Sequence, residues 1–463
     1  MAYIGSTPTS QNFISGTDYF NGTGSQTAFT LTRTVNSVND IEAVVNNVVQ
    51  RPNDAYTLSG TTITFTSAPS SGTNNIYVRY LSTTLQSITV PANSITRNQL
   101  DSNLQSVAIG KNKIINGAMV IDQRNAGASV SINPDAYTLD RWKAFASGTA
   151  KFSVQQNAGS VTPPVGFTNY LGMTSLAATT VGSTDYFLIR QNIEGYNVAD
   201  LGWGTANAKT ITLSFWVRSS LTGTFGGSLQ NSAGNRSYPF TYTINSANTW
   251  EYETITIAGD TSGTWLTTNG LGLQVNFSIG MGSTYSGTAG AWAAAGYNSA
   301  TGATSVVGTN GATFYITGVQ LEVGSSATGY EYRQYGQELA LCQRYYEKNF
   351  PADVAPTNSY GNGFGGGSNA WVSFSTTNIR GPQFGFRVSK RASPTMVYYN
   401  GNSPTSGTLG IYDAVASTWR ATTAGTTYVT TEEWRTDSTT SGWTPVTGNA
   451  YLFSGWWTAS AEL

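Results

Sequence analysis

The 463-residue sequence contains no histidine and only one cysteine, Cys342. Without an imidazole to accept the proton, Ser-His-Asp and Cys-His nucleophilic sites are excluded. Zinc sites that use histidine are excluded as well, and one cysteine cannot supply the thiolates of the remaining kinds. No disulfide can form within the chain. We therefore expect burial, and association between chains, to stabilise the fold.

Charge is also scarce: charged residues make up 10% of the chain, and the formal net charge is −1. Proteins bind a nucleic-acid backbone through clusters of Lys and Arg residues, and the sequence shows no such cluster. We therefore expect no nucleic-acid partner. No stretch approaches the ~20 apolar residues that span a bilayer, so we expect no membrane insertion. The opening MAYIGSTPTSQ lacks the basic region and apolar run of a signal peptide. We expect a soluble product made in a cytoplasm.

The sequence indicates neither a metal site nor a cofactor. Calcium is held by oxygen ligands at regular spacing in a dedicated loop. The aspartates in the expected β regions are isolated and lack that spacing; those considered are Asp135, Asp140, Asp185 and Asp260.

The abundant residues are glycine, with 51 copies, and serine, threonine and asparagine. These residues favour turns, and the aromatic residues, at 12%, suit the pleated surface of a sheet. Short runs of alternating apolar residues recur along the chain, which predicts an all-β fold with many short strands.

The first expected domain, residues 18–85, is a small antiparallel β domain. Its runs include Phe29 and Leu31, and Asn46-Asn47 predicts a tight turn between two of them. The string YFNGTGSQTAFTLTRTVNSVNDIEAVVNNVVQ, continued by YTLSGTTITFTSAPSSGTNNIYVRYL, resembles the N-terminal domain of T7-like bacteriophage tail fibres. In that family the domain fixes the fibre to the tail, which implies phage tail or adaptor partners for residues 1–85. A generic β module is the alternative.

Two polar segments flank this domain. Residues 1–17 are expected to be an arm that orders only against a partner. Residues 86–112 are expected to be a connector with a short helix, because Leu100, Leu104 and Val107 fall on one helical face. A helix with so short an apolar stripe is only marginally stable alone in water. The stripe is therefore expected either to meet its copies on a trimer axis or to pack on its own chain.

Residues 113–335 are expected to form a larger jelly-roll β-sandwich. In TITLSFWVRSS the apolar residues alternate, and LGLQVNFSIGMG repeats the pattern with Leu273 to Ile279. With NKIINGAMVIDQRN and YTLDRW at its start, this domain is similar to the carbohydrate-binding-module-like sandwiches of phage tail proteins. No binding residue of that family is carried over.

A helix over residues 336–349 is expected to join domains or subunits. The stretch GVQLEVGSSATGYEYRQYGQELALCQRYYEK, which contains it, resembles phage tail fibre proteins. Leu339, Cys342 and Tyr346 share one face of such a helix. Cys342 is expected to be a small buried hydrophobe, since a thiolate nucleophile would lack a histidine.

Residues 350–463 are expected to form a C-terminal receptor-binding β-sandwich. Aromatic residues of the middle and C-terminal domains are candidate platforms for stacking a sugar, with ordinary packing as the alternative for each, and those of the middle domain lie in glycine-rich, loop-like segments. In the middle domain they are Trp203, Trp265, Tyr285, Trp292 and Tyr297. In the C-terminal domain they are Trp371, Tyr398, Tyr399, Trp419, Trp434, Trp443 and Trp456.

The resemblances imply a homotrimeric tail fibre of the virion, assembled in the host cytoplasm, that binds a host cell-surface glycan or protein. No enzymatic activity is expected. One alternative is a structural tail or capsid appendage that never contacts the host. The other is a polysaccharide depolymerase, whose acids would be Glu251 and Glu253, ~7 Å apart on one strand face, or the adjacent Glu432 and Glu433.

Overall fold

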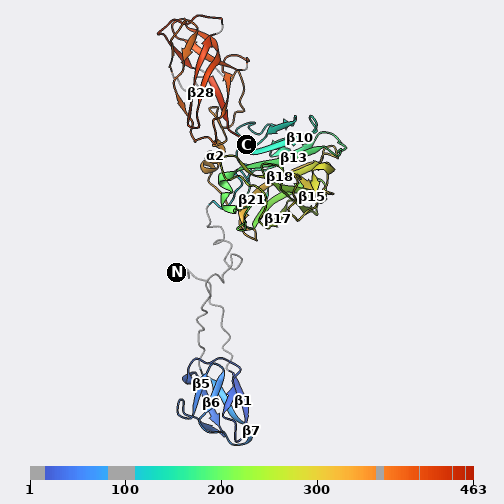
Figure 1. Cartoon of the computed structure of the whole chain (residues 1–463), viewed down its shortest axis with the longest axis vertical. Helices are drawn as coiled ribbons and strands as arrows, with labels where there is room; N and C mark the ends of the chain where they lie inside the picture. The colour runs from blue at the N-terminus through green and yellow to red at the C-terminus, as the bar shows by residue number, and fades with distance from the viewer. Residues whose placement is uncertain (1–15, 82–109, 361–369, 406, 441, 454) are drawn as a thin grey trace. The chain divides into compact units, whose positions relative to one another are not determined.

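The computed structural model describes residues 16–81, 110–360, 370–405, 407–440, 442–453 and 455–463 (Figure 1). The chain divides into two compact units, Met1–Thr96 and Arg97–Leu463. The predicted all-β class is confirmed, because the described ranges hold strands β1 to β31 and one α-helix. None of the described helices is long and apolar enough to cross a membrane. The expected stripe of Leu100, Leu104 and Val107 and most of the expected N-terminal arm lie outside the described residues.

The first unit holds two antiparallel sheets, of strand order β1-β7-β3-β4 and β2-β6-β5. Asn46 and Asn47 both have positive φ, 47° and 67°, and form the predicted tight turn between β3 and β4. Alternating side chains such as Phe29, Ile63 and Ile76 fill the space between the sheets. The strands are β1 (Thr17–Gly22), β2 (Ala28–Thr30), β3 (Ile41–Val45), β4 (Val48–Val49), β5 (Tyr56–Ser59), β6 (Thr62–Phe65) and β7 (Gly72–Tyr80).

A buried carboxylate ties β1 to the rest of the first unit. Asp18 accepts hydrogen bonds from the Thr32 amide at 2.7 Å, the Thr32 hydroxyl at 2.6 Å and the Tyr80 hydroxyl. Burial alone would raise the pKa of Asp18, but these hydrogen bonds outweigh it and hold the pKa below its usual range.

We expect the first unit to lose stability in acid through Asp18. A lowered carboxyl pKa stabilises the fold fully above the ordinary value of about 3.9, and the gain is lost as pH falls through the folded pKa. Asp18→Asn should cost about 1–3 kcal/mol at neutral pH and flatten this acid dependence. The amide signals of β7 in the wild-type protein and in Asp18→Asn, followed by NMR from pH 6 to 2, measure the loss of stability and its dependence on pH. Equal acid sensitivity in the variant would contradict the assignment.

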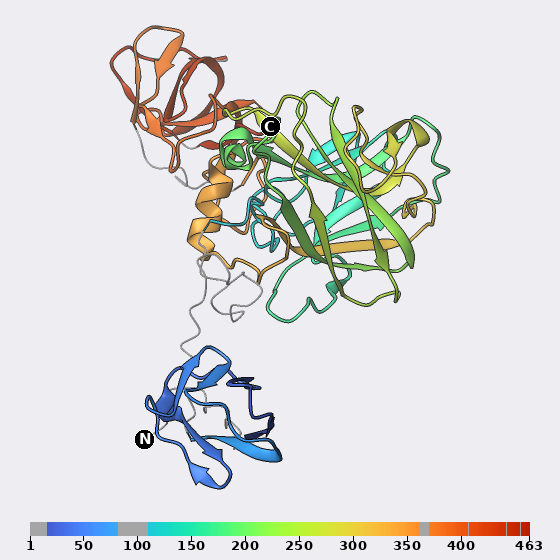
Figure 2. The ribbon, with the colours of Figure 1, turned by 60° about the horizontal axis from the view of Figure 1, so that its bottom comes forward.

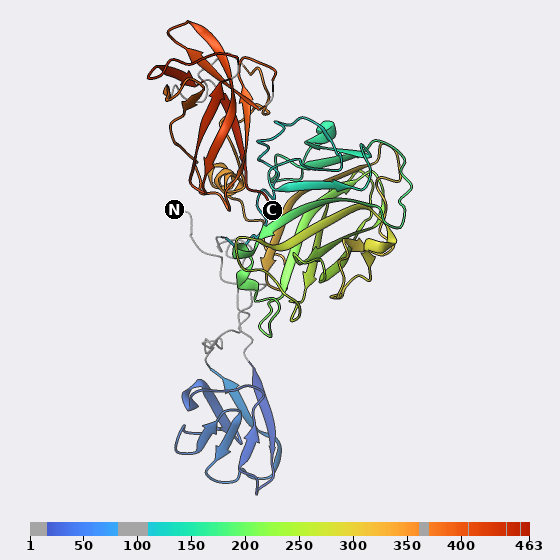
Figure 3. The same ribbon diagram turned by 45° about the horizontal axis from the view of Figure 1, so that its top comes forward.

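The second unit begins with a β-sandwich of two six-stranded sheets (Figure 3). The β14 sheet has the order β17-β14-β21-β12-β11-β8, and the β13 sheet has the order β16-β15-β18-β13-β10-β9. The strands are β8 (Val130–Ser131), β9 (Asp135–Tyr137), β10 (Trp142–Ala146), β11 (Phe152–Gln156), β12 (Leu171–Ser175), β13 (Tyr186–Glu194), β14 (Ile211–Ser219), β15 (Gly223–Gln230), β16 (Ser237–Ile244), β17 (Glu251–Ile257), β18 (Leu271–Met281) and β21 (Thr313–Val323). Shorter elements connect them: η3 (Ala158–Ser160), η4 (Gly195–Asn197), η5 (Ala199–Leu201), η6 (Ser283–Tyr285), β19 (Ser286–Gly287) and β20 (Ser299–Ala300), while η1 (Val38–Asp40) belongs to the first unit.

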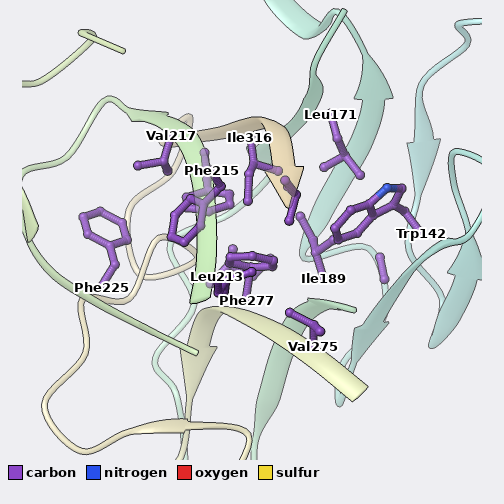
Figure 4. Close-up of a cluster of buried hydrophobic side chains, with 14 of the residues drawn as sticks. Trp142, Leu171, Ile189, Leu213, Phe215, Val217, Phe225, Val275, Phe277 and Ile316 are labelled. Carbon is purple, nitrogen blue, oxygen red and sulfur yellow. The ribbon is translucent and has the colours of Figure 1, made fainter. Parts of the chain in front are cut away.

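The sandwich core lies between these two sheets, where every second residue of each strand points inward. The alternating residues predicted for β14 and β18 are confirmed as buried, and Phe215, Phe277 and Trp142 converge in it (Figure 4). Phe215 meets Phe277 edge to face at 5.1 Å between ring centroids. The residues between the inward ones therefore face outward on each sheet.

The C-terminal domain contains a closed antiparallel sheet. Its strands follow the order β24-β23-β30-β27-β28-β29, and β29 pairs again with β24. A three-stranded sheet, β22-β31-β26, completes the domain. The strands are β22 (Tyr346–Lys348), β23 (Ala370–Ser373), β24 (Asn378–Arg380), β25 (Phe384–Gly385), β26 (Thr395–Asn400), β27 (Thr408–Asp413), β28 (Thr418–Val429), β29 (Glu433–Thr440), β30 (Ala450–Phe453) and β31 (Gly455–Ser460).

Helix α2 (Tyr335–Gln343) lies beside the sandwich and leads into the C-terminal domain (Figure 2). It is shorter than the predicted helix of residues 336–349. The prediction that Tyr346 lies on it is wrong, because Tyr346 begins β22 and pairs with Ser460 of β31. Backbone pairing with β31 therefore replaces the last expected helical turn.

Candidate functional site

Three aromatic residues predicted from the middle domain come together at one end of the sandwich. The rings of Trp203, Trp265 and Trp292 meet edge to face, with centroids 4.8–5.5 Å apart. Each indole N–H donates to a backbone carbonyl of the domain itself. Trp203 is buried in the core, and the other two pack against it. This cluster caps the core, and its polar edges are already occupied.

Tyr285 and Tyr297 do not join that cluster. Tyr285 is half-buried and packs edge to face on Tyr186 at 5.7 Å. The half-buried ring of Tyr297 covers Gly287, where a Cβ would come within 2.3 Å of it. The absence of a side chain at Gly287 therefore allows this close approach.

Three aromatic residues predicted as sugar platforms in the C-terminal domain are not available to a ligand. Trp371 and Trp434 have no exposed surface, and Trp456 is 5% exposed. Trp456 stacks on Phe350 at 4.8 Å between ring centroids. These predictions are wrong, because Trp371 and Trp434 belong to the core of the domain and Trp456 is buried against Phe350, where burying a large apolar area is favourable.

Trp419 and Trp443 keep part of their surface. Both are half-buried. Trp419 packs on Tyr412 with ring centroids 5.0 Å apart. Trp443 donates its indole N–H to the Ala421 carbonyl at 3.0 Å, so its polar edge is occupied. Of the other two predicted tyrosines, Tyr398 is buried and Tyr399 is half-buried.

An aromatic groove lies instead on the outer face of the β14 sheet, and none of its aromatic residues was among the predicted platforms. Its volume is about 390 Å³. We define the aromatic groove by five rings that line it: Phe167, Trp216, Tyr252, Tyr330 and Tyr332.

The floor of the groove is formed by two neighbouring strands. Trp216 on β14 lies directly opposite Tyr252 on β17, and their rings are 5.3 Å apart at 48°. Trp216 faces outward because its neighbours Phe215 and Val217 are buried in the core. Tyr252 is 44% exposed. The floor therefore presents two adjacent ring surfaces, one of them widely open to solvent.

The walls come from two loops that are distant in sequence. Phe167 contacts Tyr330 at 5.1 Å and Tyr332 at 5.6 Å between ring centroids. Phe167 also lies over a bulge of β21 at Gly318, whose φ is +62°. A Cβ at Gly318 would come within 2.6 Å of the Phe167 ring, so glycine permits both the backbone turn and the packing.

The polar groups of the groove are uncharged. Ser214 and Tyr252 bring hydroxyl groups to the groove. Burial raises the pKa of Tyr252, so this hydroxyl stays protonated at neutral pH. No Asp, Glu, Lys or Arg is among the described residues that line the groove. Aromatic faces with a few hydroxyl groups suit a neutral ligand that has apolar faces and hydroxyl edges.

The carboxylates considered for catalysis lie elsewhere. Glu251 accepts hydrogen bonds from the amides of Asn245 and Ser246 and closes the turn before β17. Glu253 lies opposite Phe215 on the inward side of the sheet edge. Glu432 accepts a hydrogen bond from Ser389. None of these acids lines the aromatic groove.

The aspartates considered for calcium each have other partners. Asp260 pairs with Arg236, and Asp135 pairs with Lys143. Asp140 accepts hydrogen bonds from Gln123, and Asp185 accepts one from Ser147. Within the described ranges, no three His, Cys, Asp or Glu residues gather closely enough to hold a metal ion.

The joint residues of α2 pack against the start of the sandwich. Cys342 has no exposed surface and lies with Ile115, Ile121 and Tyr345, while Leu339 packs on this cluster. Burial raises the pKa of the Cys342 thiol, which disfavours the reactive thiolate. Cys342 therefore contributes packing between α2 and the sandwich.

No family model matches the chain, and no curated protein matches it. Similar solved structures include the enzymatically active domain of tailspike protein 4 of bacteriophage CBA120, at 13% identity and a TM-score of 0.27, covering 46% of this chain and 21% of that chain. The chain thus spans about a fifth of that tailspike chain. A family 4 carbohydrate-binding module matches at 15% identity, with a TM-score of 0.23 and coverage of 45% and 98%. A family 11 carbohydrate-binding module from Clostridium thermocellum, in complex with a mixed-linked tetrasaccharide, matches at 11%, with a TM-score of 0.22 and coverage of 42% and 96%. Likenesses of this size carry no inference about ligand or activity.

Proposed function

We propose that the chain is a phage tail fibre whose sandwich domain binds a neutral glycan in the aromatic groove. The groove carries this proposal. It offers exposed ring faces to the apolar faces of a sugar, and its hydroxyl groups suit the sugar's hydroxyls. Its lack of carboxylates favours binding over hydrolysis, since glycosidases use a carboxylate pair.

The remaining parts of the proposal come from the sequence strings quoted above. Residues 1–85 attach the fibre to a tail or adaptor protein, the assembly is a homotrimer of the virion, and the domains beyond the connector reach the host envelope. Three grooves per fibre, with several fibres per particle, give avidity without a tight single site. A structural appendage would need no such groove. If the chain were an appendage, removal of the groove would leave adsorption to the host intact.

The Trp216→Ala variant tests the proposal. We expect it to bind a candidate host about 10–100-fold more weakly, because a central aromatic contact contributes ~2 kcal/mol or more. The labelled full chain is titrated onto cells before and after periodate treatment, which destroys vicinal diols of glycans. The matched control is Trp443→Ala, which removes a half-buried indole outside the groove.

Each outcome of this titration has a clear meaning. Binding that is lost with periodate and weakened by Trp216→Ala, while Trp443→Ala is unaffected, supports the proposal. Binding that survives periodate contradicts the proposal that the receptor is a glycan. Equal binding by the wild-type protein, Trp216→Ala and Trp443→Ala contradicts the proposal that the aromatic groove is the binding site.

A further inference from the structure

The outer face of the β13 sheet carries a guanidinium group without a carboxylate partner among the described residues. Arg190 on β13 lies between Lys143 of β10 and Asn276 of β18 in the register of the sheet. Its Nε donates to Asn276 Oδ1 at 2.5 Å, and its Nη2 donates to Asn298 Oδ1 at 3.0 Å. Both acceptors are neutral amides. The Nη1 group makes no hydrogen bond within the described ranges, and the residue is half-buried.

The two amides hold the Arg190 side chain in one orientation. Asn276 is fully buried, and its own amide donates to Ser228 on the next strand at 2.9 Å. Asn298 comes from the segment that ends in β20, which packs over β15, β16 and β18. Arg190 is thus anchored from the sheet below and from the segment that crosses it, and Nη1 is left for a ligand.

An aromatic ring lies beside this group. The Arg190 guanidinium carbon is 4.8 Å from the centre of the Phe145 ring, and Lys143 Nζ is 4.7 Å from it. Phe145 is half-buried, so part of its surface is open. Lys143 is already paired with Asp135 at 2.5 Å. Arg190 therefore carries the uncompensated charge on this face, which we define as the Arg190 face: Lys143, Phe145, Arg190, Asn276 and Asn298.

Some half-buried arginines in this unit are paired with carboxylates, while Arg218 and Arg391 donate to backbone carbonyls instead. Arg236 is paired with Asp260, and Arg344 with Glu194, each at 2.6 Å. A half-buried cation without a counter-charge is costly, and burial lowers the pKa of Arg190 to about 10. The Arg190 face therefore presents a guanidinium whose two acceptors are neutral amides.

We propose that the Arg190 face binds an acidic sugar, with the sugar carboxylate on Arg190 and the sugar ring against Phe145. The inference rests on the proposed glycan-binding function and adds a second subsite on the opposite sheet. The aromatic groove, which lacks charge, takes neutral sugar units, and the Arg190 face takes a unit with a carboxylate. Because the two sites lie on opposite faces of the sandwich, they engage separate stretches of polysaccharide, which raises avidity.

The test uses two matched ligands and the full chain. Tetragalacturonate and the neutral tetramer obtained by reducing its carboxyl groups are titrated calorimetrically into the wild-type protein. We expect the acidic tetramer to bind at least 10-fold more tightly, because a hydrogen bond to a charged group is stronger than a neutral one. Arg190→Gln should remove this advantage, and Arg190→Lys should retain only part of it, because lysine lacks the planar fork.

Two controls separate this inference from the proposed groove. Arg380→Gln removes an exposed guanidinium in the C-terminal domain and should leave both affinities unchanged. Trp216→Ala should weaken a groove ligand and leave the acidic preference intact. An acidic preference without any binding in the groove would refute the groove while sustaining the Arg190 face.

Three results would overturn the inference: no saturable binding of tetragalacturonate, equal binding of the two tetramers, or an unchanged preference in Arg190→Gln. The comparison of ligands on the wild-type protein needs no variant, so it can still refute the inference if Arg190→Gln fails to fold, and Arg190→Lys then tests the assignment to Arg190.

Discussion

Replacing Glu347 with alanine is expected to lower the free energy of unfolding of the second unit by about 3–5 kcal/mol, because it leaves a buried ammonium without its counter-charge. Lys390 Nζ lies 2.5 Å from Glu347 Oε2, and both side chains are at most 2% exposed. Desolvation lowers the pKa of Lys390, although the contact with Glu347 opposes that shift. The pair joins β22 to the segment before β26.

The unfolding transition is measured by tryptophan fluorescence in urea. All 12 tryptophans lie beyond residue 96, so the signal reports the second unit alone. Arg380→Ala is the control, since it breaks a partly exposed ion pair with Asp437 and should cost at most about 1 kcal/mol. Replacing both partners, Glu347→Leu with Lys390→Met, should recover most of the loss. A loss below 1 kcal/mol in Glu347→Ala would contradict the account.

The second large effect is expected at Trp434, where alanine should cost about 3–5 kcal/mol through the cavity that it leaves. The Trp434 ring has no exposed surface. It stacks on Phe384 at 4.8 Å and lies 5.4 Å from Tyr398 and 5.7 Å from Trp457, measured between ring centroids. These contacts join β29 to the three-stranded sheet of β26 and β31.

Thermal unfolding, followed by the fluorescence of the remaining tryptophans, measures this cost. Trp434→Phe should lose much less, because the indole N–H has no acceptor among the described residues and the ring contacts are largely kept. Trp419→Ala serves as the half-buried control and should shift the midpoint less than Trp434→Ala. If Trp434→Ala left the midpoint temperature of unfolding unchanged but weakened glycan binding, the packing role would be contradicted and Trp434 would again be a candidate ligand platform.

Alternation in the sequence was sufficient to predict the strands and their inward faces. Leu213, Phe215 and Val217 of β14 are buried as their period of two requires. The turn at Asn46-Asn47 followed from residues that tolerate positive φ. Such features depend on neighbours in sequence, so local reasoning reaches them.

The aromatic groove depended on contacts that no local pattern contains. Trp216 and Tyr252 lie on regular strands, whereas the residues predicted as sugar platforms in the middle domain lie in glycine-rich, loop-like segments. Phe167 and Tyr332 come from loops far apart in the chain, which only the assembled sheet brings together. The outward direction of Trp216 was a usable signal, because its neighbours on both sides face the core.

The burial of the C-terminal tryptophans shows the same limit. Trp456 was expected to be available to a sugar, and the next residue of the strand is Trp457. Both are at most 6% exposed, because β31 is covered on both faces, by Phe350 on one and by Trp434 on the other. A strand covered on both faces has no outward residue, and alternation cannot reveal that second cover.

The closed sheet of the C-terminal domain limits how another protein can bind to it. Each of its six strands, β23, β24, β27, β28, β29 and β30, has a hydrogen-bonded neighbour on both sides. A partner that recognises a sheet by adding a strand needs a row of unpaired N–H and C=O groups at an edge. The paired lengths of this ring offer no such row, so recognition there must act through side chains and turns. The same closure guards against strand-mediated aggregation wherever many copies of the chain lie close together.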